Sequence, residues 1–113
     1  AYAVRFAEED ETAIGYAKLG PPKLPFTPPT DAVELRQLYV LAPWHGRGVA
    51  DALMRWTLDE ARARAARELY LSVFVDNHRA QRFYARYGFE RVGAYTFMVG
   101  DHADEDHVMR LAL

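Results

Sequence analysis

The chain has 113 residues, of which 50% are hydrophobic and 27% are charged, and this suits one compact domain with a modest core. Its formal net charge of −2 excludes the global basic field that attracts nucleic acid. The chain contains no cysteine, which excludes disulfides, thiolate zinc sites and a thiol nucleophile, and no apolar run approaches the roughly 20 residues of a membrane span. Because the first residues also lack the form of a signal peptide, we expect a single cytoplasmic domain over residues 1–113 without a membrane partner.

The start of the chain is expected to form a β-hairpin followed by a loop. Residues 1–7 alternate bulky and small side chains, residues 8–11 read as a charged turn, and residues 12–19 read as a second strand. The segment 20–31 contains five of the six prolines. Proline fixes φ and removes a hydrogen-bond donor, so this segment must be a loop. A loop of this length is either functional or a plain connection.

A strand, a glycine-bearing turn and an amphipathic helix are predicted in the middle of the chain. The strand covers residues 33–40, and its alternation breaks near Gln37 and Leu38, for which a β-bulge is one explanation. The turn covers residues 45–50, and the helix runs from about residue 49 to residue 65. The apolar stripe of this helix has the spacing of one helix face and consists of Ala50, Leu53, Met54, Thr57, Leu58 and Ala61.

This glycine-bearing turn indicates a site for a phosphorylated ligand. The first N–H groups of a helix have no partner inside the helix, and the helix dipole favours negative charge there. Glycine adopts positive φ and lets the backbone approach a ligand closely. The turn is not a dinucleotide fingerprint, which would need glycine in place of Asp51, and it is not a P-loop. A tight connection without a ligand is the alternative.

The second half of the chain is predicted to alternate strands with one short helix. A buried central strand over residues 69–75 leads to Asn77, which has the character of an N-cap, and the helix that follows is closed by Gly88. The chain then ends in a strand, an acidic loop and a last strand, over residues 90–97, 100–106 and 107–113. The order β-β-β-α-β-α-β-β predicts an α/β (α+β) domain with a mixed central sheet and a right-handed parallel β-α-β unit in its middle.

Two motifs resemble the signatures of the GCN5-related N-acetyltransferase (GNAT) family, which transfers acetyl groups from acetyl-coenzyme A to amines. The first family signature is Arg/Gln-x-x-Gly-x-Gly/Ala after a strand, and it falls on His45, Gly48 and Ala50. The second signature falls on Asn77, Ala80, Tyr84, Gly88 and Phe89. The resemblance covers roughly residues 2–113. It implies a GNAT-like mixed sheet that lacks the family's usual N-terminal strand and the two helices after it.

The resemblance also implies an activity. The domain would be an acetyl-CoA-dependent N-acetyltransferase that acts on a small-molecule or protein amine by direct attack in a ternary complex. Acetyl-CoA would be its co-substrate, and no metal is expected. The alternative is a catalytically weak or silent coenzyme A-binding module that acts with a partner chain, because the missing helices normally wall the acceptor site. The same gap is expected of a truncated or processed chain, of a domain whose acceptor wall comes from a partner subunit, or of a minimal variant, and it is compatible with a homodimer.

The resemblance assigns coenzyme-binding roles by position. Backbone groups of Leu38, Tyr39 and Val40 would pair with the pantetheine arm, as an added strand pairs with a sheet edge. Backbone N–H groups of the turn would hold the pyrophosphate, and Asn77 would bond the pantetheine chain. Binding is expected to survive the replacement of the usual Arg/Gln by His45. The expected cofactor-binding residues are Leu38, Tyr39, Val40, His45, Gly46, Arg47, Gly48, Val49, Ala50, Asp51, Asn77, Ala80 and Tyr84.

Two residues carry the expected catalysis. Tyr84 would protonate the departing thiolate, and a phenol with pKa near 10 suits a thiol with pKa near 8.5. Glu34 would serve as the general base, because a glutamate at this offset is the base in the histone-acetylating branch of the family. The alternatives are a core aromatic residue for Tyr84 and a structural or surface carboxylate for Glu34.

The C-terminal segment is similar to that of the branch that acetylates spermidine and spermine. The acidic residues of this segment would then receive a polycationic amine, and they are Asp101, Asp104, Glu105 and Asp106. A solvated acidic loop is the alternative.

Overall fold

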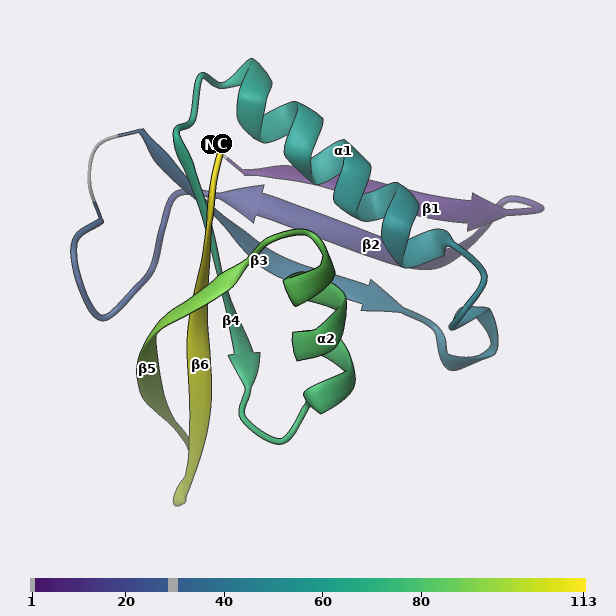
Figure 1. The fold of residues 1–113 in the computed structure, drawn as a ribbon. Coiled ribbons are helices and arrows are strands. Elements are labelled where there is room, and N and C mark those ends of the chain that lie inside the picture. The colour runs from purple at the N-terminus through teal and green to yellow at the C-terminus, as the bar shows by residue number, and fades with distance from the viewer. Residues whose placement is uncertain (1, 29–30) are drawn as a thin grey trace.

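The computed structural model describes residues 2–28 and 31–113, and Figure 1 shows its strands and helices in chain order. The elements are β1 (Ala3–Glu9), β2 (Thr12–Gly20), β3 (Ala32–Val40), the 3-10 turn η1 (Ala42–Trp44), α1 (Val49–Ala63), β4 (Glu68–Phe74), α2 (His78–Arg86), β5 (Glu90–Val99) and β6 (His102–Ala112). This order confirms the sequence prediction. Residues 29 and 30 of the predicted proline-rich loop lie outside the described residues, and residues 21–28 contain neither helix nor strand.

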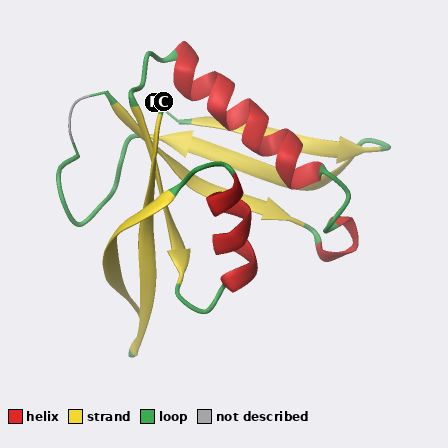
Figure 2. Ribbon diagram, viewed as in Figure 1, coloured by secondary structure: helices red, strands yellow, loops and turns green. Residues whose placement is uncertain are grey.

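The strands form one mixed sheet in the order β1-β2-β3-β4-β6-β5, drawn in yellow in Figure 2. Strands β3 and β4 are parallel, as predicted for the β-α-β unit, and the other neighbours are antiparallel. Strand β6 returns between β4 and β5, so the last hairpin is joined to the sheet by its second strand. The sequence predicted these two last strands but not their order in the sheet.

The core lies on one face of the sheet, beneath both helices. Side chains of α1 and α2 meet strand residues of a single face in one buried cluster, whose members include Leu19, Leu35, Leu53, Met54, Leu69, Leu71, Tyr84, Phe89 and Met109. The predicted stripe of α1 supplies four of the buried positions, namely Leu53, Met54, Thr57 and Ala61. Burying one Leu or Met side chain contributes roughly 1.5–3 kcal/mol, so this cluster fixes both helices over the sheet.

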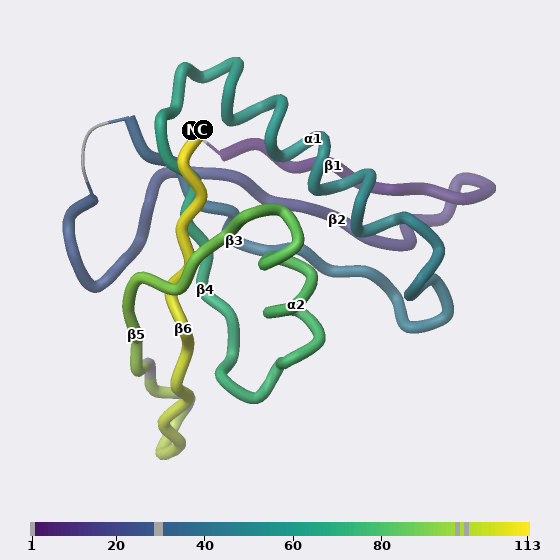
Figure 3. The backbone as a smooth tube through the Cα atoms, in the orientation of Figure 1, coloured from purple at the N-terminus to yellow at the C-terminus, as the bar shows by residue number. Residues whose placement is uncertain are grey.

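Strands β3 and β4 separate soon after they begin. Only residues 32–34 pair with residues 68–70, and Figures 1 and 3 show the two strands diverging, with α2 between their ends. The pairing of β2 with β3 skips Arg36, because Lys18 opposes Gln37 and Leu19 opposes Leu35. This is the predicted bulge, one residue before Gln37. A bulge strengthens the local twist of a strand, and here it accompanies the opening between β3 and β4.

The predicted acidic loop over residues 100–106 is wrong in most of its length. Residues His102 to Asp106 belong to β6, and the turn is confined to Gly100 and Asp101. Asp106 lies between two strands, since it is paired with Phe74 of β4 and with Tyr95 of β5. Acidic residues are uncommon in strands, and this misled the prediction. Long-range pairing, which the local sequence does not report, overrides that propensity.

The face of β1–β3 that lies opposite the helices carries exposed aromatic side chains. Phe6, Tyr16 and Tyr39 form a row of rings across the three strands, with centroids 6.0 and 6.1 Å apart. Phe6 and Tyr39 are 55% and 53% exposed. Within the described chain this face has no covering helix.

Candidate functional site

Two adjoining cavities lie between the end of β3, the start of α1 and the side of α2. The first has a volume of about 510 Å³ and is lined by Val40, Trp44, His45, Gly46, Gly48, Ala50, Asp51, Arg79, Arg82, Phe83 and Arg86. The second has a volume of about 350 Å³ and is lined by Leu38, Tyr39, Val40, Ala42, His45, Ala50, Asn77, Arg79, Ala80, Phe83 and Tyr84. Five residues line both cavities, so the two form one continuous groove at the opening between β3 and β4.

The glycine turn at one end of the groove presents unpaired N–H groups. Gly46 and Gly48 have φ values of 75° and 82°, and such values favour glycine. Gly48 is the N-cap of α1, without a side-chain cap, and the Ala52 N–H makes the first intrahelical bond, to the Gly48 carbonyl. Within the described chain, the N–H groups of residues 46–51 have no main-chain acceptor. The turn therefore has the geometry of an anion site.

The edge of β3 supplies further main-chain groups to the groove. The Leu41 N–H donates to the Ile14 carbonyl of β2 over 2.8 Å. Alternate residues of a strand direct their N–H and C=O groups to opposite sides. The main chain of Tyr39 therefore faces β2, whereas that of Leu38 and Val40 faces the opening. Tyr39 is nevertheless among the residues that line the second cavity.

His45 joins β3 to α2 where the two cavities meet. Its Nε2 lies 2.8 Å from the Val40 carbonyl oxygen, and its Nδ1 lies 2.6 Å from Arg79 Nη1. A carbonyl only accepts and a guanidinium only donates. Nε2 therefore carries the proton, Nδ1 accepts from Arg79, and the imidazole is neutral in this arrangement. Both ring nitrogens are used to hold the two walls of the groove together.

Arginine side chains of α2 line the first cavity, and sequence reasoning missed them. Arg79, Arg82 and Arg86 follow a spacing of three and four residues, which places them on one side of a helix. That spacing was visible in the sequence and could have revealed a basic wall. Asp51 lies in the same cavity, and its carboxylate accepts a 2.5 Å hydrogen bond from the Tyr87 hydroxyl.

Tyr84 and Asn77 lie together at the second cavity. Tyr84 is 9% exposed, and its ring packs edge-on against Phe83 and Phe89 at centroid distances of 5.5 and 5.8 Å. Burial raises the pKa of Tyr84 to about 12, so the phenol is neutral at physiological pH. Asn77 caps α2 as predicted, with its Oδ1 accepting from the Ala80 N–H over 3.1 Å. This cap leaves the amide N–H₂ of Asn77 available to the groove.

The buried phenol of Tyr84 predicts a specific loss of stability at high pH. The pKa of Tyr84 is about 12 in the folded chain against an ordinary 10.0. Its neutral phenol therefore contributes fully to the free energy of unfolding below pH 10, and this contribution is lost as the pH rises from 10 to 12. At pH 11.5 the loss should be about 2 kcal/mol. Urea unfolding at pH 9 and at pH 11.5 gives the free energy of unfolding at each pH. Between these two pH values, Tyr84→Phe should lose less free energy of unfolding than the parent chain. Equal losses would contradict the burial of an un-ionised phenol.

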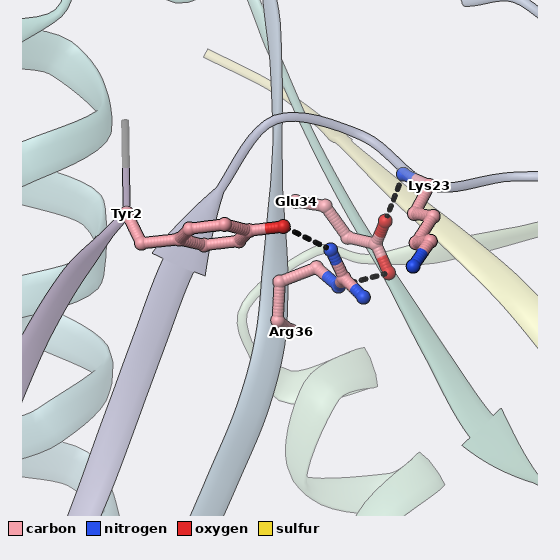
Figure 4. Close-up of polar contacts among 4 residues, drawn as sticks. All are labelled: Tyr2, Lys23, Glu34 and Arg36. Carbon is pink, nitrogen blue, oxygen red and sulfur yellow. Dashed lines mark hydrogen bonds and ion pairs between the residues drawn. The ribbon is translucent and has the colours of Figure 1, made fainter.

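Glu34 lies apart from Tyr84, in the polar network shown in Figure 4. Its Oε1 accepts from the Lys23 N–H over 2.7 Å, and its Oε2 lies 3.7 Å from Arg36 Nε. Arg36 also donates to the Tyr2 hydroxyl over 3.2 Å. Glu34 is 5% exposed, and desolvation raises its pKa against the opposing effects of the Lys23 N–H and the Arg36 charge. Neither cavity is lined by Glu34.

Residues 2–28 and 31–113 contain no group of three or more His, Asp or Glu side chains placed to hold a metal ion. No helix within the same ranges is both long enough and apolar enough to cross a membrane.

Known proteins resemble this chain in sequence and in fold. An uncharacterized N-acetyltransferase of Mycobacterium tuberculosis (Rv2669) is 40% identical over 107 residues, which cover 95% of this chain and 65% of that relative. The chain therefore spans 65% of the length of this relative. The crystal structure of a ribosomal-protein-alanine N-acetyltransferase of Brucella melitensis has a TM-score of 0.83 at 25% identity, over 99% of this chain and 69% of that one.

A further similar structure was solved with a coenzyme. The PaiA N-acetyltransferase of Thermoplasma acidophilum, in complex with coenzyme A, has a TM-score of 0.76 at 20% identity, over 99% of this chain and 61% of that one. These likenesses confirm the predicted GNAT-like fold. The model of the acetyltransferase (GNAT) family matches residues 1–89. With most of its length matched by that model, the chain belongs to the GNAT acetyltransferase family.

Proposed function

We propose that this domain binds acetyl-CoA along the groove and transfers the acetyl group to a primary amine by direct attack in a ternary complex. The observation that carries the proposal is the order of groups along the groove. Unpaired N–H groups of the glycine turn lie at one end, the free edge of β3 lies in the middle, and Tyr84 lies at the other cavity. Coenzyme A has the same order of chemistry, with phosphates, two amides and a thiol.

The coenzyme contacts follow from this order. The N–H groups of residues 46–51 hold the pyrophosphate, with help from the dipole of α1. The main chain of Leu38 and Val40 pairs with the pantetheine amides as an added strand would, and the Asn77 amide donates from the opposite wall. The Val40 carbonyl already accepts from His45. The ring of His45 must therefore share or give up this carbonyl when a pantetheine N–H arrives.

Tyr84 is proposed to act on the leaving sulfur. The amine lone pair attacks the thioester carbonyl carbon, a C–N bond forms, and the tetrahedral oxyanion collapses as the C–S bond breaks. The proton lost by the amine nitrogen balances the proton gained by the thiolate. A phenol of pKa about 12 is a weaker acid than a thiol of pKa near 8.5. Tyr84 therefore donates a hydrogen bond to the developing thiolate, and full ionisation of its phenol is not required.

Glu34 is proposed as the base that removes the amine proton, acting through water because both of its oxygens already have partners. Glu34→Gln keeps the size of the side chain and its acceptor for the Lys23 N–H. We expect this change to lower kcat/KM by about 100-fold at pH 7 and to remove the acidic limb of the pH–rate profile. An unchanged profile, with a lower melting temperature, would assign Glu34 to the fold alone.

The acceptor is proposed to be a protein N-terminus or a small amine. The similar Brucella enzyme is named for ribosomal-protein alanine, which supports the first class. The resemblance of the C-terminal segment to the polyamine-acetylating branch motivates the second class, although Asp106 is only 8% exposed and neither Asp104 nor Asp106 lines either cavity of the groove. The exposed aromatic side chains of Phe6 and Tyr39, on the face of the sheet opposite the helices, offer a surface that can receive a peptide.

Thiol release from acetyl-CoA tests the activity directly. The acceptor panel contains an alanine-initiated peptide, the same peptide with a blocked N-terminus, a lysine peptide and spermidine. We expect amine-dependent release with at least one free amine and none with the blocked peptide. Coenzyme A binding without turnover of any amine would instead support the silent binding module.

A further inference from the structure

The side of α2 that lines the groove is strongly positive. Arg79, Arg82 and Arg86 all line the first cavity. The carboxylate that lines it with them belongs to Asp51, which already accepts from Tyr87. Among the described ion pairs, none joins these arginines to a carboxylate. The groove therefore has guanidinium groups that lack an anionic partner in the described chain.

The local arrangement of these arginines is unfavourable without an anion. Like charges three and four residues apart on a helix repel each other. Arg79 also lies in the first turn of α2, where the helix dipole disfavours positive charge and where no acidic residue compensates. Locally unfavourable charges beside a cavity indicate a role in binding an anion.

The three arginines lie at different positions along the groove, which suggests different roles. Arg79 lines both cavities and donates to His45, so it lies where the phosphate and pantetheine regions meet. Arg82 and Arg86 line only the first cavity. The hydrogen bond between Tyr87 and Asp51 brings the end of α2 to the first turn of α1. Arg82 and Arg86 therefore lie at the glycine-turn end of the groove, away from the second cavity, which Tyr84 lines.

Coenzyme A has a third phosphate in that direction. Beyond its pyrophosphate lies a ribose that carries a 3′-phosphate, and dephospho-coenzyme A lacks this group alone. Guanidinium groups bind phosphate through paired hydrogen bonds. We propose that Arg82 and Arg86 form a second anion site, which binds the 3′-phosphate and makes the domain select coenzyme A over dephospho-coenzyme A. This inference rests on the proposed coenzyme function and adds a specificity determinant to it.

Calorimetric titration of the 113-residue chain with coenzyme A and with dephospho-coenzyme A tests the inference. We expect the parent chain to bind coenzyme A about tenfold more tightly, and this ratio should shrink as salt is raised from 0.05 to 0.5 M. The Arg82→Gln, Arg86→Gln double variant should lose about tenfold in affinity for coenzyme A and less than about twofold for dephospho-coenzyme A. Arg62→Gln is the matched control, since it lies about 20 Å from the turn at the other end of α1, and it should leave both affinities unchanged.

Each other outcome has a distinct meaning. Equal affinity of the parent chain for the two ligands would overturn the 3′-phosphate site and leave the coenzyme function standing. Equal losses for both ligands in the double variant would assign the arginines to the pyrophosphate and overturn the inference. Failure of the parent chain to bind either ligand would overturn the proposed function, and the inference with it.

Discussion

Replacing Tyr84 by phenylalanine is expected to lower kcat for acetyl transfer by about 100-fold, while the affinity for acetyl-CoA stays within about twofold. The ring of Tyr84 packs against Phe83 and Phe89, and phenylalanine keeps those contacts. Its hydroxyl has no hydrogen-bond partner in the described chain, so the folded state loses little when the hydroxyl is removed. The sulfur loses its hydrogen-bond donor as negative charge develops in the transition state. Single-turnover rates and calorimetric affinities measure the two quantities separately.

Phe83→Leu is the matched control for Tyr84→Phe, since it alters the neighbouring ring without removing a hydroxyl. Its main effect should be on coenzyme affinity, because Phe83 lines both cavities. A parallel loss of kcat and affinity in Tyr84→Phe would contradict a role at the sulfur. The raised pKa adds a second check. Activity should show no limb from Tyr84 ionisation below about pH 11, given a pKa of about 12.

Replacing Gly48 by aspartate should weaken acetyl-CoA binding by at least about 100-fold without unfolding the chain. Gly48 lines the first cavity, and a Cβ added there meets nothing within 4 Å. Its φ of 82° is one that aspartate and asparagine adopt more readily than other side chains. The new carboxylate would lie at the end of α1 that is proposed to hold the pyrophosphate.

Gly48→Asn is the control that isolates charge from bulk, because asparagine has the shape and backbone preferences of aspartate. We expect the asparagine variant to lose about tenfold in affinity, and the aspartate variant to lose at least tenfold more. Aspartate is also a good N-cap and suits the helix dipole. Its melting temperature should therefore equal or exceed that of the asparagine variant. Equal affinities of the two variants for acetyl-CoA would contradict the binding of the pyrophosphate at this turn.

Local sequence was sufficient where a feature depends on neighbouring residues. The glycine turn, the Asn77 cap, the Gly88 end of α2 and the stripe of α1 follow from backbone preferences and periodicity, and the structure confirms them. The bulge in β3 was placed within one residue, because an extra residue shifts the alternation of every later side chain.

Features that depend on distant partners could not be predicted. Asp106 belongs to a strand because β4 and β5 flank it, although its neighbours in sequence suggest a loop. Glu34 is held by Lys23, eleven residues earlier in the chain. Its offset before residues 38–40 suggested a base, by resemblance to the histone-acetylating branch, but could not report its burial. The bridge from His45 to Arg79 joins residues 34 positions apart. The spacing of Arg79, Arg82 and Arg86 in the sequence places them on one side of α2. That this side faces the groove could be learned only from the fold.

Binding of acetyl-CoA along the groove can be followed by an NMR titration of the ¹⁵N-labelled chain, which reports each main-chain N–H group separately. We expect the largest shifts at the amides of residues 46–51, with further shifts at Leu38, Val40 and the side-chain amide of Asn77. Shifts confined to β5 and β6, or to the exposed aromatic face of β1–β3, with the amides of residues 46–51 unchanged, would contradict binding along the groove.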